Sequence, residues 1–296
     1  MKLKSPTMRL LFTALAFLIS VSVLSQNQQS IVISENQWIE IPAWQTSTSY
    51  TLSAWVFFPL PNPIETNWHT LFSKYEGGDH HIMFHYDGEL GIYKNNEFHA
   101  CGFSSNEIEN GFHYITSVAT GGATFFYVDG ELVGNSGEQI YGLMHTIGNI
   151  AAPFGGGNQP IGQIDDVSIW SYAQTDQEIN QFMNCPPIGV EGGLISHYNF
   201  ESVLDDIVYS ISPFNGAYDG TLEGEPVFSF NTPENNCGLD SDDCDGQDFC
   251  GDGTIWDSTT QTCVSENDPS YPDNNGDNCV DINDLLNLLI FFGTCE

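Results

Sequence analysis

Oxygen-bearing side chains recur at short intervals in the segment DNNGDNCVDIND, residues 273–284. Twelve-residue loops that bind Ca²⁺ donate oxygens from positions 1, 3, 5, 7, 9 and 12, and position 7 supplies a backbone carbonyl. Here these six positions are occupied by Asp273, Asn275, Asp277, Cys279, Asp281 and Asp284. The spacing predicts a calcium site, and the alternative is a solvated turn rich in Asp and Asn.

The residues after this loop predict a helix that would support it. Apolar side chains recur at helical spacing and a glycine follows that can end the helix: Ile282, Leu285, Leu286, Leu289 and Gly293. Asp284 closes the loop where many calcium loops use Glu, and in this the segment resembles the loops of dockerin repeats. A dockerin has two such loops, whereas this chain has one. The resemblance implies bound calcium and a protein partner that docks on the tail.

The sequence has eight cysteines. They are expected to form disulfides if the chain is exported, because the environment outside the cell is oxidising. Six of them crowd the last 60 residues, and the sequence alone leaves their pairing open. Cys279 and Cys295 bracket the predicted helix and could be bridged. Cys250 and Cys263 bracket a short predicted hairpin that contains a Trp. No CxxC pair is present, which argues against zinc.

The N-terminus has the form of a secretory signal. Three basic residues precede an apolar run at 10–24, and Ser25 is small enough for a cleavage site. Residues 1–25 are therefore predicted to be a signal peptide, with an uncleaved anchor as the alternative. The mature chain is expected to be secreted or to lie at the cell surface, with no membrane span of its own.

The net charge is −34, with 5 basic and 39 acidic residues. Such a chain is not expected to bind nucleic acid or anionic membranes, and it favours cations or neutral sugars as ligands.

Short runs rich in Val, Ile, Tyr, Phe, Trp and Thr alternate with Gly, Asn, Asp and Pro turns through 26–184. This pattern predicts an all-β, two-sheet antiparallel jelly-roll sandwich. Asp129–Gly130 predicts a hairpin turn, and Thr175 with Glu178 predicts a capping box on one short helix. Residues 185–235 are predicted to be a linker and a β segment, which either completes the sandwich or is the remnant of a second copy. Residues 236–296 form a Cys-rich, acidic module.

Several stretches resemble laminin G-like, or concanavalin A-like, jelly-roll domains. The matching stretches fall in family order and are WIEIP (38–42), TLSAWVFF (51–58), TLFSKY (70–75), ATFFYVDGELVG (123–134) and GQIDDVSIWSYAQTDQEI (162–179). The resemblance implies recognition of a polysaccharide, a glycoprotein or a matrix ligand, often with a calcium ion. Asp165 and Asp166 are candidates for one structural ion, and the alternative is that they bond to neighbouring loop backbone.

Catalysis is not expected from the motifs present. Related β-glucanases carry Glu-x-Asp-x-x-Glu on one strand as nucleophile and general acid, and this sequence has no such run. The sequence therefore predicts a non-catalytic binding protein. The alternatives are a glycoside hydrolase or lyase on the same fold, and a structural adhesion component that docks through its tail.

The three histidines of the segment DHHIMFHYD (79–87) resemble a set of metal ligands. On a strand, however, His81 and His85 would lie about 13 Å apart, too far to share an ion. We expect surface or edge histidines, and His81 and His85 could line a sugar-binding face with Trp68, Tyr75 and Tyr86 as stacking planes.

Overall fold

The computed structural model describes residues 28–61, 67–74, 78–149, 159–234, 237, 254–257 and 262–265. It contains two compact units, residues 1–235 and 236–296, and each is described by itself. The predicted signal peptide, the calcium loop and Tyr75 lie outside the described residues. No helix in the described part of the chain is long and apolar enough to cross a bilayer.

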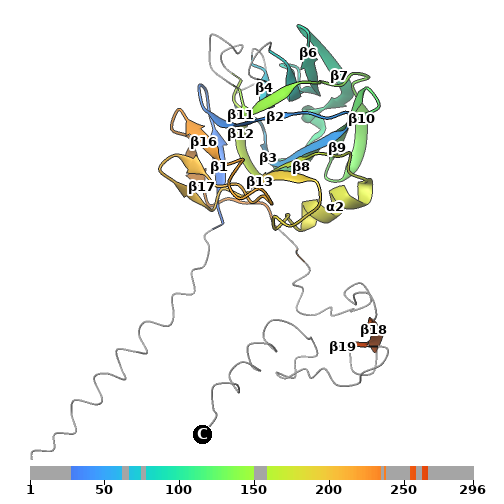
Figure 1. The fold of residues 1–296 in the computed structure, drawn as a ribbon. Helices are drawn as coiled ribbons and strands as arrows, with labels where there is room; N and C mark the ends of the chain where they lie inside the picture. The colour runs from blue at the N-terminus through green and yellow to red at the C-terminus, as the bar shows by residue number, and fades with distance from the viewer. Residues whose placement is uncertain are drawn as a thin grey trace, which may run out of the picture. The chain divides into compact units, whose positions relative to one another are not determined.

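The first unit is a sandwich of two antiparallel sheets, as predicted (Figure 1). One sheet has the order β10-β9-β8-β3-β12-β1-β17, and β13 also pairs with β12. Its strands are β1 (Ser30–Ile33), β3 (Tyr50–Phe58), β8 (Gly111–Thr120), β9 (Ala123–Val128), β10 (Glu131–Asn135), β12 (Gly162–Trp170), β13 (Leu194–Tyr198) and β17 (Val227–Ser229).

The second sheet has the order β14-β15-β16-β2-β11-β4-β5-β6-β7. Its strands are β2 (Trp38–Gln45), β4 (His69–Ser73), β5 (His80–Phe84), β6 (Glu89–Lys94), β7 (Glu97–Ser104), β11 (Leu143–Gly148), β14 (Val203–Leu204), β15 (Ile207–Val208) and β16 (Gly220–Glu223). A 3₁₀ turn, η1 (Ser105–Glu107), follows β7.

The central strand β3 shows why the sequence forms this sandwich. It pairs with β8 through nine successive residues without a register shift. Leu52, Ala54 and Val56 enter the core between the sheets, while Ser53 and Trp55 point to the opposite face because side chains alternate along a strand. Burying each large aliphatic side chain in such a core contributes about 1.5–3 kcal/mol to stability.

Helix α2 (Asp176–Asn184) covers the outer face of the first sheet (Figure 1). Ile179 is fully buried against Tyr114, Val118 and Tyr127 of β8 and β9. The predicted capping box is confirmed: the Thr175 side chain accepts from the Glu178 backbone, and the Glu178 side chain accepts from the Thr175 backbone. The helix therefore starts where the sequence indicated.

Residues 194–229 complete the sandwich. Strand β13 pairs with β12, β16 pairs with β2 and β17 pairs with β1. Of the two alternatives left open for this segment, the structure shows the first, because its strands add to both sheets of the same domain.

In the second unit the described strands are β18 (Thr254–Asp257) and β19 (Thr262–Ser265), which pair antiparallel. This pairing agrees with the short hairpin predicted here, except that the second strand includes Cys263 and continues to Ser265. The candidate bridges among Cys250, Cys263, Cys279 and Cys295 fall outside the described side chains.

The expectation that every cysteine is oxidised is wrong for Cys101. This thiol on β7 is free and buried, and burial raises its pKa to about 11. Cys185, at the end of α2, and Cys237 are both disulfide-bonded. Cys101 packs in the apolar core between the sheets.

Candidate carbohydrate-binding face

Five aromatic or imidazole rings gather on the second sheet, on the side that faces away from the core. They form the aromatic patch: Trp68, His85, Tyr86, Tyr93 and Phe98. The Trp68 ring centroid lies 4.4 Å from that of His85, 5.6 Å from Tyr93 and 5.5 Å from Phe98. These are the separations and edge-on angles that aromatic pairs favour. Tyr86 is 46% exposed at the rim, so the patch reaches solvent.

The hairpin β6–β7 places two of these rings. Its turn residues Asn95 and Asn96 both have positive φ (53° and 66°), the conformation of a two-residue hairpin turn. This turn sets Tyr93 opposite Phe98. Because Ile92 enters the core, Tyr93 points to the other face. The local sequence therefore determines that these two rings lie side by side.

Gly91 lets the Phe98 ring lie close to the sheet. A Cβ at position 91 would fall 2.9 Å from the Phe98 ring and 2.3 Å from the His99 carbonyl oxygen. Any side chain there would displace both the ring and the strand pairing. Phe98 then stacks on His85, with ring centroids 5.0 Å apart and planes inclined by 20°.

His85 joins the patch to a carboxylate. Its Nδ1 lies 2.7 Å from Asp87 Oδ1, just beyond the end of β5. Asn106 donates a hydrogen bond to the Asp87 carbonyl oxygen. The rim of the patch thus supplies polar groups next to aromatic surface, which is the combination that sugar-binding sites need.

The expectation of surface histidines at positions 80 and 81 is wrong. His81 is 1% exposed and lies in the core beside Tyr50, with the Tyr50 hydroxyl 2.9 Å from its Nδ1. His80 is 4% exposed and contacts Thr70 and Tyr93. The reason is that β5 is an interior strand, and its register shifts against both neighbours. Of the proposed pair, only His85 belongs to the aromatic patch.

Burial holds both histidines neutral. It lowers the pKa of His80 to about 4. It lowers that of His81 to about 3, with smaller contributions from the nearby His80 and Lys74. Neither ring then adds positive charge to the sheet at neutral pH.

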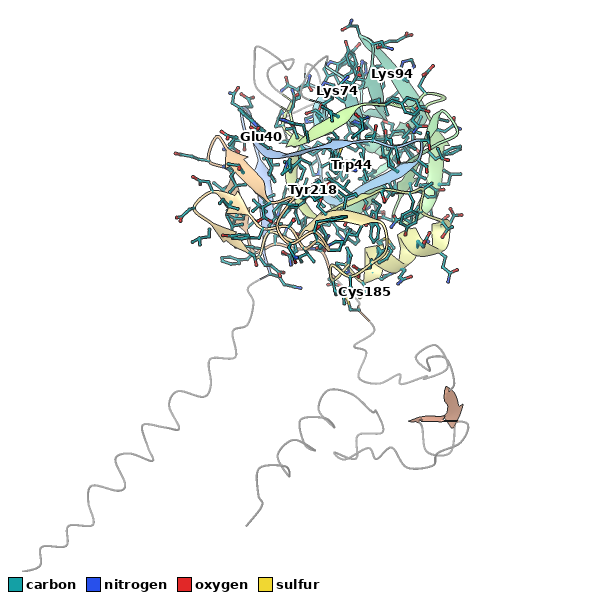
Figure 2. The ribbon with its side chains drawn as sticks, viewed as in Figure 1. Glu40, Trp44, Lys74, Lys94, Cys185 and Tyr218 are labelled. Atoms are coloured by element: carbon teal, nitrogen blue, oxygen red, sulfur yellow. The ribbon has the colours of Figure 1, made fainter. Side chains whose placement is uncertain are left out.

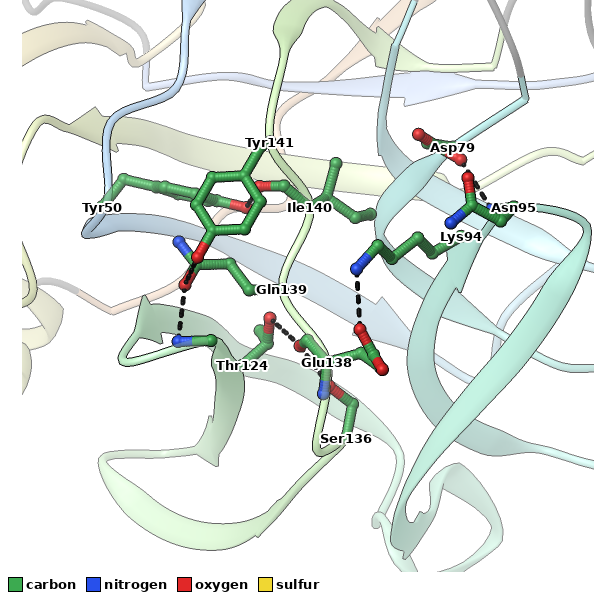
Figure 3. A network of polar contacts seen from close by, with 11 residues as sticks. Tyr50, Asp79, Lys94, Asn95, Thr124, Ser136, Glu138, Gln139, Ile140 and Tyr141 are labelled. Carbon is green, nitrogen blue, oxygen red and sulfur yellow. Dashed lines mark hydrogen bonds and ion pairs between the residues drawn. The ribbon is translucent and has the colours of Figure 1, made fainter.

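The lysines of the described chain are engaged by carboxylates. Lys74 Nζ lies 3.7 Å from Asp79 Oδ2. Lys94 Nζ lies 2.7 Å from Glu138 Oε2 (Figure 3). Figure 2 labels both lysines. Asp79 also accepts a hydrogen bond from the Asn95 backbone (Figure 3). Both cations are therefore paired locally, which leaves this part of the surface poorly suited to an anionic ligand.

Asp165 and Asp166 lie on the first sheet, at a register shift of β12 against β3. Both are about 5% exposed, and Asp166 has a left-handed φ of 47°. Asp165 accepts a hydrogen bond from the Asp166 backbone. Asp166 Oδ1 lies 3.3 Å from His197 Nε2, and Ser168 bonds to the other nitrogen of His197.

Asp165 and Asp166 were expected either to hold one structural ion or to bond to neighbouring loop backbone, and the groups around them distinguish these alternatives. The described residues contain no group of three or more His, Cys, Asp or Glu side chains arranged to hold a metal. Asp165 bonds to backbone, as the second alternative requires. Burial, followed by the charge of Asp166, raises the pKa of Asp165 to about 9. The raised pKa favours the protonated form of Asp165, which lowers the negative charge buried beside Asp166.

Sequence reasoning did not single out Tyr93 and Phe98. The Asn-Asn turn between them was a usable signal, because it places the residues one pair beyond the turn opposite each other. Trp68 and Tyr86 were named as stacking planes, and the structure brings both to the patch. Asp273, Asn275, Asp277, Cys279, Asp281 and Asp284 lie outside the described residues.

Residues 33–180 match the family described as the concanavalin A-like lectin/glucanases superfamily, Laminin_G_3. A jelly-roll sandwich with this match defines the class, and the chain belongs to this family. No curated protein matches the sequence.

Solved structures share the fold at low sequence identity. A candidate carbohydrate-binding protein from Bacteroides ovatus ATCC 8483 has a TM-score of 0.56 and 17% identity over 71% of this chain. The match spans 62% of the length of that protein. A heptameric SAP-like pentraxin from Limulus polyphemus has a TM-score of 0.45 and 18% identity, covering 73% of this chain and 100% of that one.

A third similar structure is domain 4 of an extracellular GH43 arabinanase from Geobacillus stearothermophilus in complex with arabinotriose. It has a TM-score of 0.39 and 16% identity, covering 51% of this chain and 74% of that one.

Proposed function

We propose that this chain is a non-catalytic carbohydrate-binding protein that holds a polysaccharide on the aromatic patch. The observation that carries the proposal is the set of rings around Trp68, gathered on the outer side of a sheet with Tyr86 exposed at the rim. Sugar rings present apolar C–H faces and polar edges. An aromatic surface bordered by carboxylate and amide groups matches both.

The fold supports the same class of function. The similar protein from Bacteroides ovatus is described as a candidate for carbohydrate binding. That likeness, at 17% identity, concerns the fold alone, so the argument for binding rests on the patch itself.

The charge favours a neutral glycan. The chain carries a net charge of −34, and Lys74 and Lys94 are paired with Asp79 and Glu138. A uronate or sulfated chain would meet repulsion without a cationic partner here. Neutral polysaccharides pay no such cost.

Affinity electrophoresis tests the proposal. The full mature chain is run in gels that contain laminarin, galactomannan, xylan or arabinan, with alginate as the anionic comparison. We expect retardation by at least one neutral polysaccharide. Trp68→Ala should weaken it at least about tenfold, or ~1.4 kcal/mol, because a central aromatic anchor is removed.

Phe230→Ala is the matched control, since Phe230 is an aromatic side chain that is 77% exposed outside the patch. Its retardation should equal that of the wild type. Equal retardation of Trp68→Ala and wild type would refute the role of the patch. New reducing ends released from the retained polysaccharide would instead favour the hydrolase alternative.

We also propose, on sequence alone, that the chain is exported and that residues 273–284 bind Ca²⁺. The oxygen spacing of the loop and the apolar run after it support the calcium proposal. In this proposal calcium stabilises the tail, and recognition of the glycan belongs to the sandwich.

A further inference from the structure

A cavity of about 150 Å³ opens at one end of the sandwich, beside the aromatic patch. It lies where β3 ends, β4 begins and β5 ends. Its inner wall is formed by the core side chains Phe58 and Phe84 and by His69, and its rim by Ser105, Asn106 and Asn110. His85 lines the cavity and also belongs to the patch, so the two surfaces are continuous.

His69 lines this cavity, and one of its ring nitrogens is a buried hydrogen-bond acceptor without a partner among the described residues. Its Nδ1 lies 2.6 Å from the Pro160 carbonyl oxygen, so Nδ1 carries the hydrogen and donates. Burial lowers the pKa of His69, although the bond to Pro160 opposes this, and the ring is neutral. Nε2 is then an acceptor, and it is buried with no hydrogen-bond partner among the described residues. A buried acceptor without a partner is unfavourable, and a hydroxyl donor that reaches it from the cavity, after a small shift of the lining side chains, relieves that cost.

The rim adds polar groups that the fold positions closely. Asn106 uses its amide nitrogen on the Asp87 carbonyl, which leaves its side-chain oxygen as an acceptor. Gly88 has a φ of +93°, and a Cβ there would fall 2.8 Å from the Asn106 amide nitrogen and 3.1 Å from the Ser105 hydroxyl. The absence of a side chain at position 88 therefore allows these rim groups to pack beside the opening.

The volume and the wall limit what can enter. A dry cavity of about 150 Å³ binds benzene, so this volume matches a small ring without substituents. The hydroxyl groups of a sugar add to that size and must extend toward the open rim. The inner wall is the packed core of the sandwich, so a ring enters from outside and a chain cannot continue through. No Lys or Arg is found among the described residues that line the cavity. The lining thus suits an uncharged ring with hydroxyl donors.

We propose that this cavity is a subsite for the terminal residue of a neutral glycan, with one sugar ring seated between His69 and the Ser105–Asn110 rim. The neighbouring residues of the same glycan then lie across His85 onto the aromatic patch. The inference rests on the proposed function and adds to it that recognition is directed to a chain end.

Asn110→Trp tests the subsite, because an indole on the exposed rim fills the opening without disturbing the core. Glu109→Trp is the matched control: it is the adjacent exposed residue, receives the same side chain and does not line the cavity. Saturation-transfer NMR is measured on the full chain with glucose, galactose, mannose, xylose and arabinose as separate probes. Affinity electrophoresis on the neutral polysaccharides is measured in parallel.

We expect saturation transfer to at least one monosaccharide in the wild type and in Glu109→Trp, and its loss in Asn110→Trp. Retardation on the retained polysaccharide should fall about tenfold in Asn110→Trp and be unchanged in Glu109→Trp. Transfer and retardation that are the same in Asn110→Trp as in the wild type would overturn the subsite, as would the absence of transfer to every monosaccharide.

The two proposals fail separately. If Trp68→Ala abolishes retardation while Asn110→Trp has no effect, the patch binds glycan and the cavity does not. If no polysaccharide retards the chain but monosaccharide transfer is lost only in Asn110→Trp, the subsite stands and the extended patch does not.

Discussion

Asp165 shows how a single buried carboxyl can oppose stability in this domain. It is 5% exposed beside Asp166, and burial together with that neighbouring charge raises its pKa to about 9. Glu201, whose pKa is raised by burial and by Asp166, adds to the acidic surroundings, and His197 lies against Asp166. The unfolded chain loses the Asp165 proton near pH 3.8 and the folded chain keeps it to about pH 9. Stability from this group is therefore complete below pH 3.8 and is lost as pH rises toward 9.

Asp165→Asn should remove this cost while keeping the side-chain oxygen that accepts from the Asp166 backbone. We expect a rise in Tm of at least about 3 °C at pH 8 and little change near pH 4, measured by calorimetry. The exposed Asp205→Asn serves as the control and should show neither effect. A Tm of Asp165→Asn that is lower than that of the wild type at pH 8 with calcium, and equal to it once calcium is chelated, would favour the ion-site alternative for Asp165 and Asp166.

At the scale of elements, α2 depends on its first turn. Few residues of this short helix are buried, and Ile179 is the one that is fully enclosed. The capping box satisfies backbone donors that the first turn would otherwise leave unpaired. The hydrogen bond from the Thr175 backbone is the main cause of the lowered pKa of Glu178. The cap thus contributes above the usual Glu pKa and weakens as pH falls through the lowered value.

Thr175→Ala should lower the free energy of unfolding at pH 7 by about 1 kcal/mol, because the cap acceptor is lost. For a domain of this size the Tm should fall by about 2–4 °C. Gln177→Ala, an exposed position in the same turn, should have no such effect since Ala is a good helix former. Equal melting of the two variants would contradict a stabilising cap.

At the scale of the whole molecule, segments distant in sequence close the sandwich. Strands β13, β16 and β17 join β12, β2 and β1, so residues 194–229, which follow α2, belong to the sandwich. A sandwich expressed without them would expose the edges of β1 and β2, which are open to unwanted pairing. The second unit follows this closed domain in sequence.

The proposed calcium loop gives a prediction for the intact chain. Addition of Ca²⁺ should raise the Tm of the tail transition, because an ion that binds only the folded loop stabilises it. Asp273→Ala combined with Asp277→Ala should abolish this rise. Asp242→Ala combined with Asp243→Ala removes the same charge from the tail outside the loop and should preserve it. A calcium-induced rise of equal size in both variants would exclude the loop as the site.

Much of the fold follows from local chemistry. The alternating apolar residues, the Asp129–Gly130 turn and the Thr175–Glu178 cap each act within a few residues, so the sequence alone predicted most of the strands, that hairpin and α2. It did not single out β7, which carries Phe98. The same local information, together with the family motifs, placed the sandwich correctly. The Asn95–Asn96 turn is also a local feature, and it sets the strand register that pairs Tyr93 with Phe98.

Only the tertiary structure decided which side chains meet at the candidate site. Trp68, His85 and Phe98 come from different strands or their ends, and their contact depends on the order β4-β5-β6-β7 across the sheet. The register shifts in β5 put His81 in the core and leave His85 on the patch. A shift of one residue reverses the face of a strand, so facing could not be read from alternation. The sequence by itself therefore determined the class of domain. The sheet order and the register shifts determined which side chains form the aromatic patch, the candidate binding face.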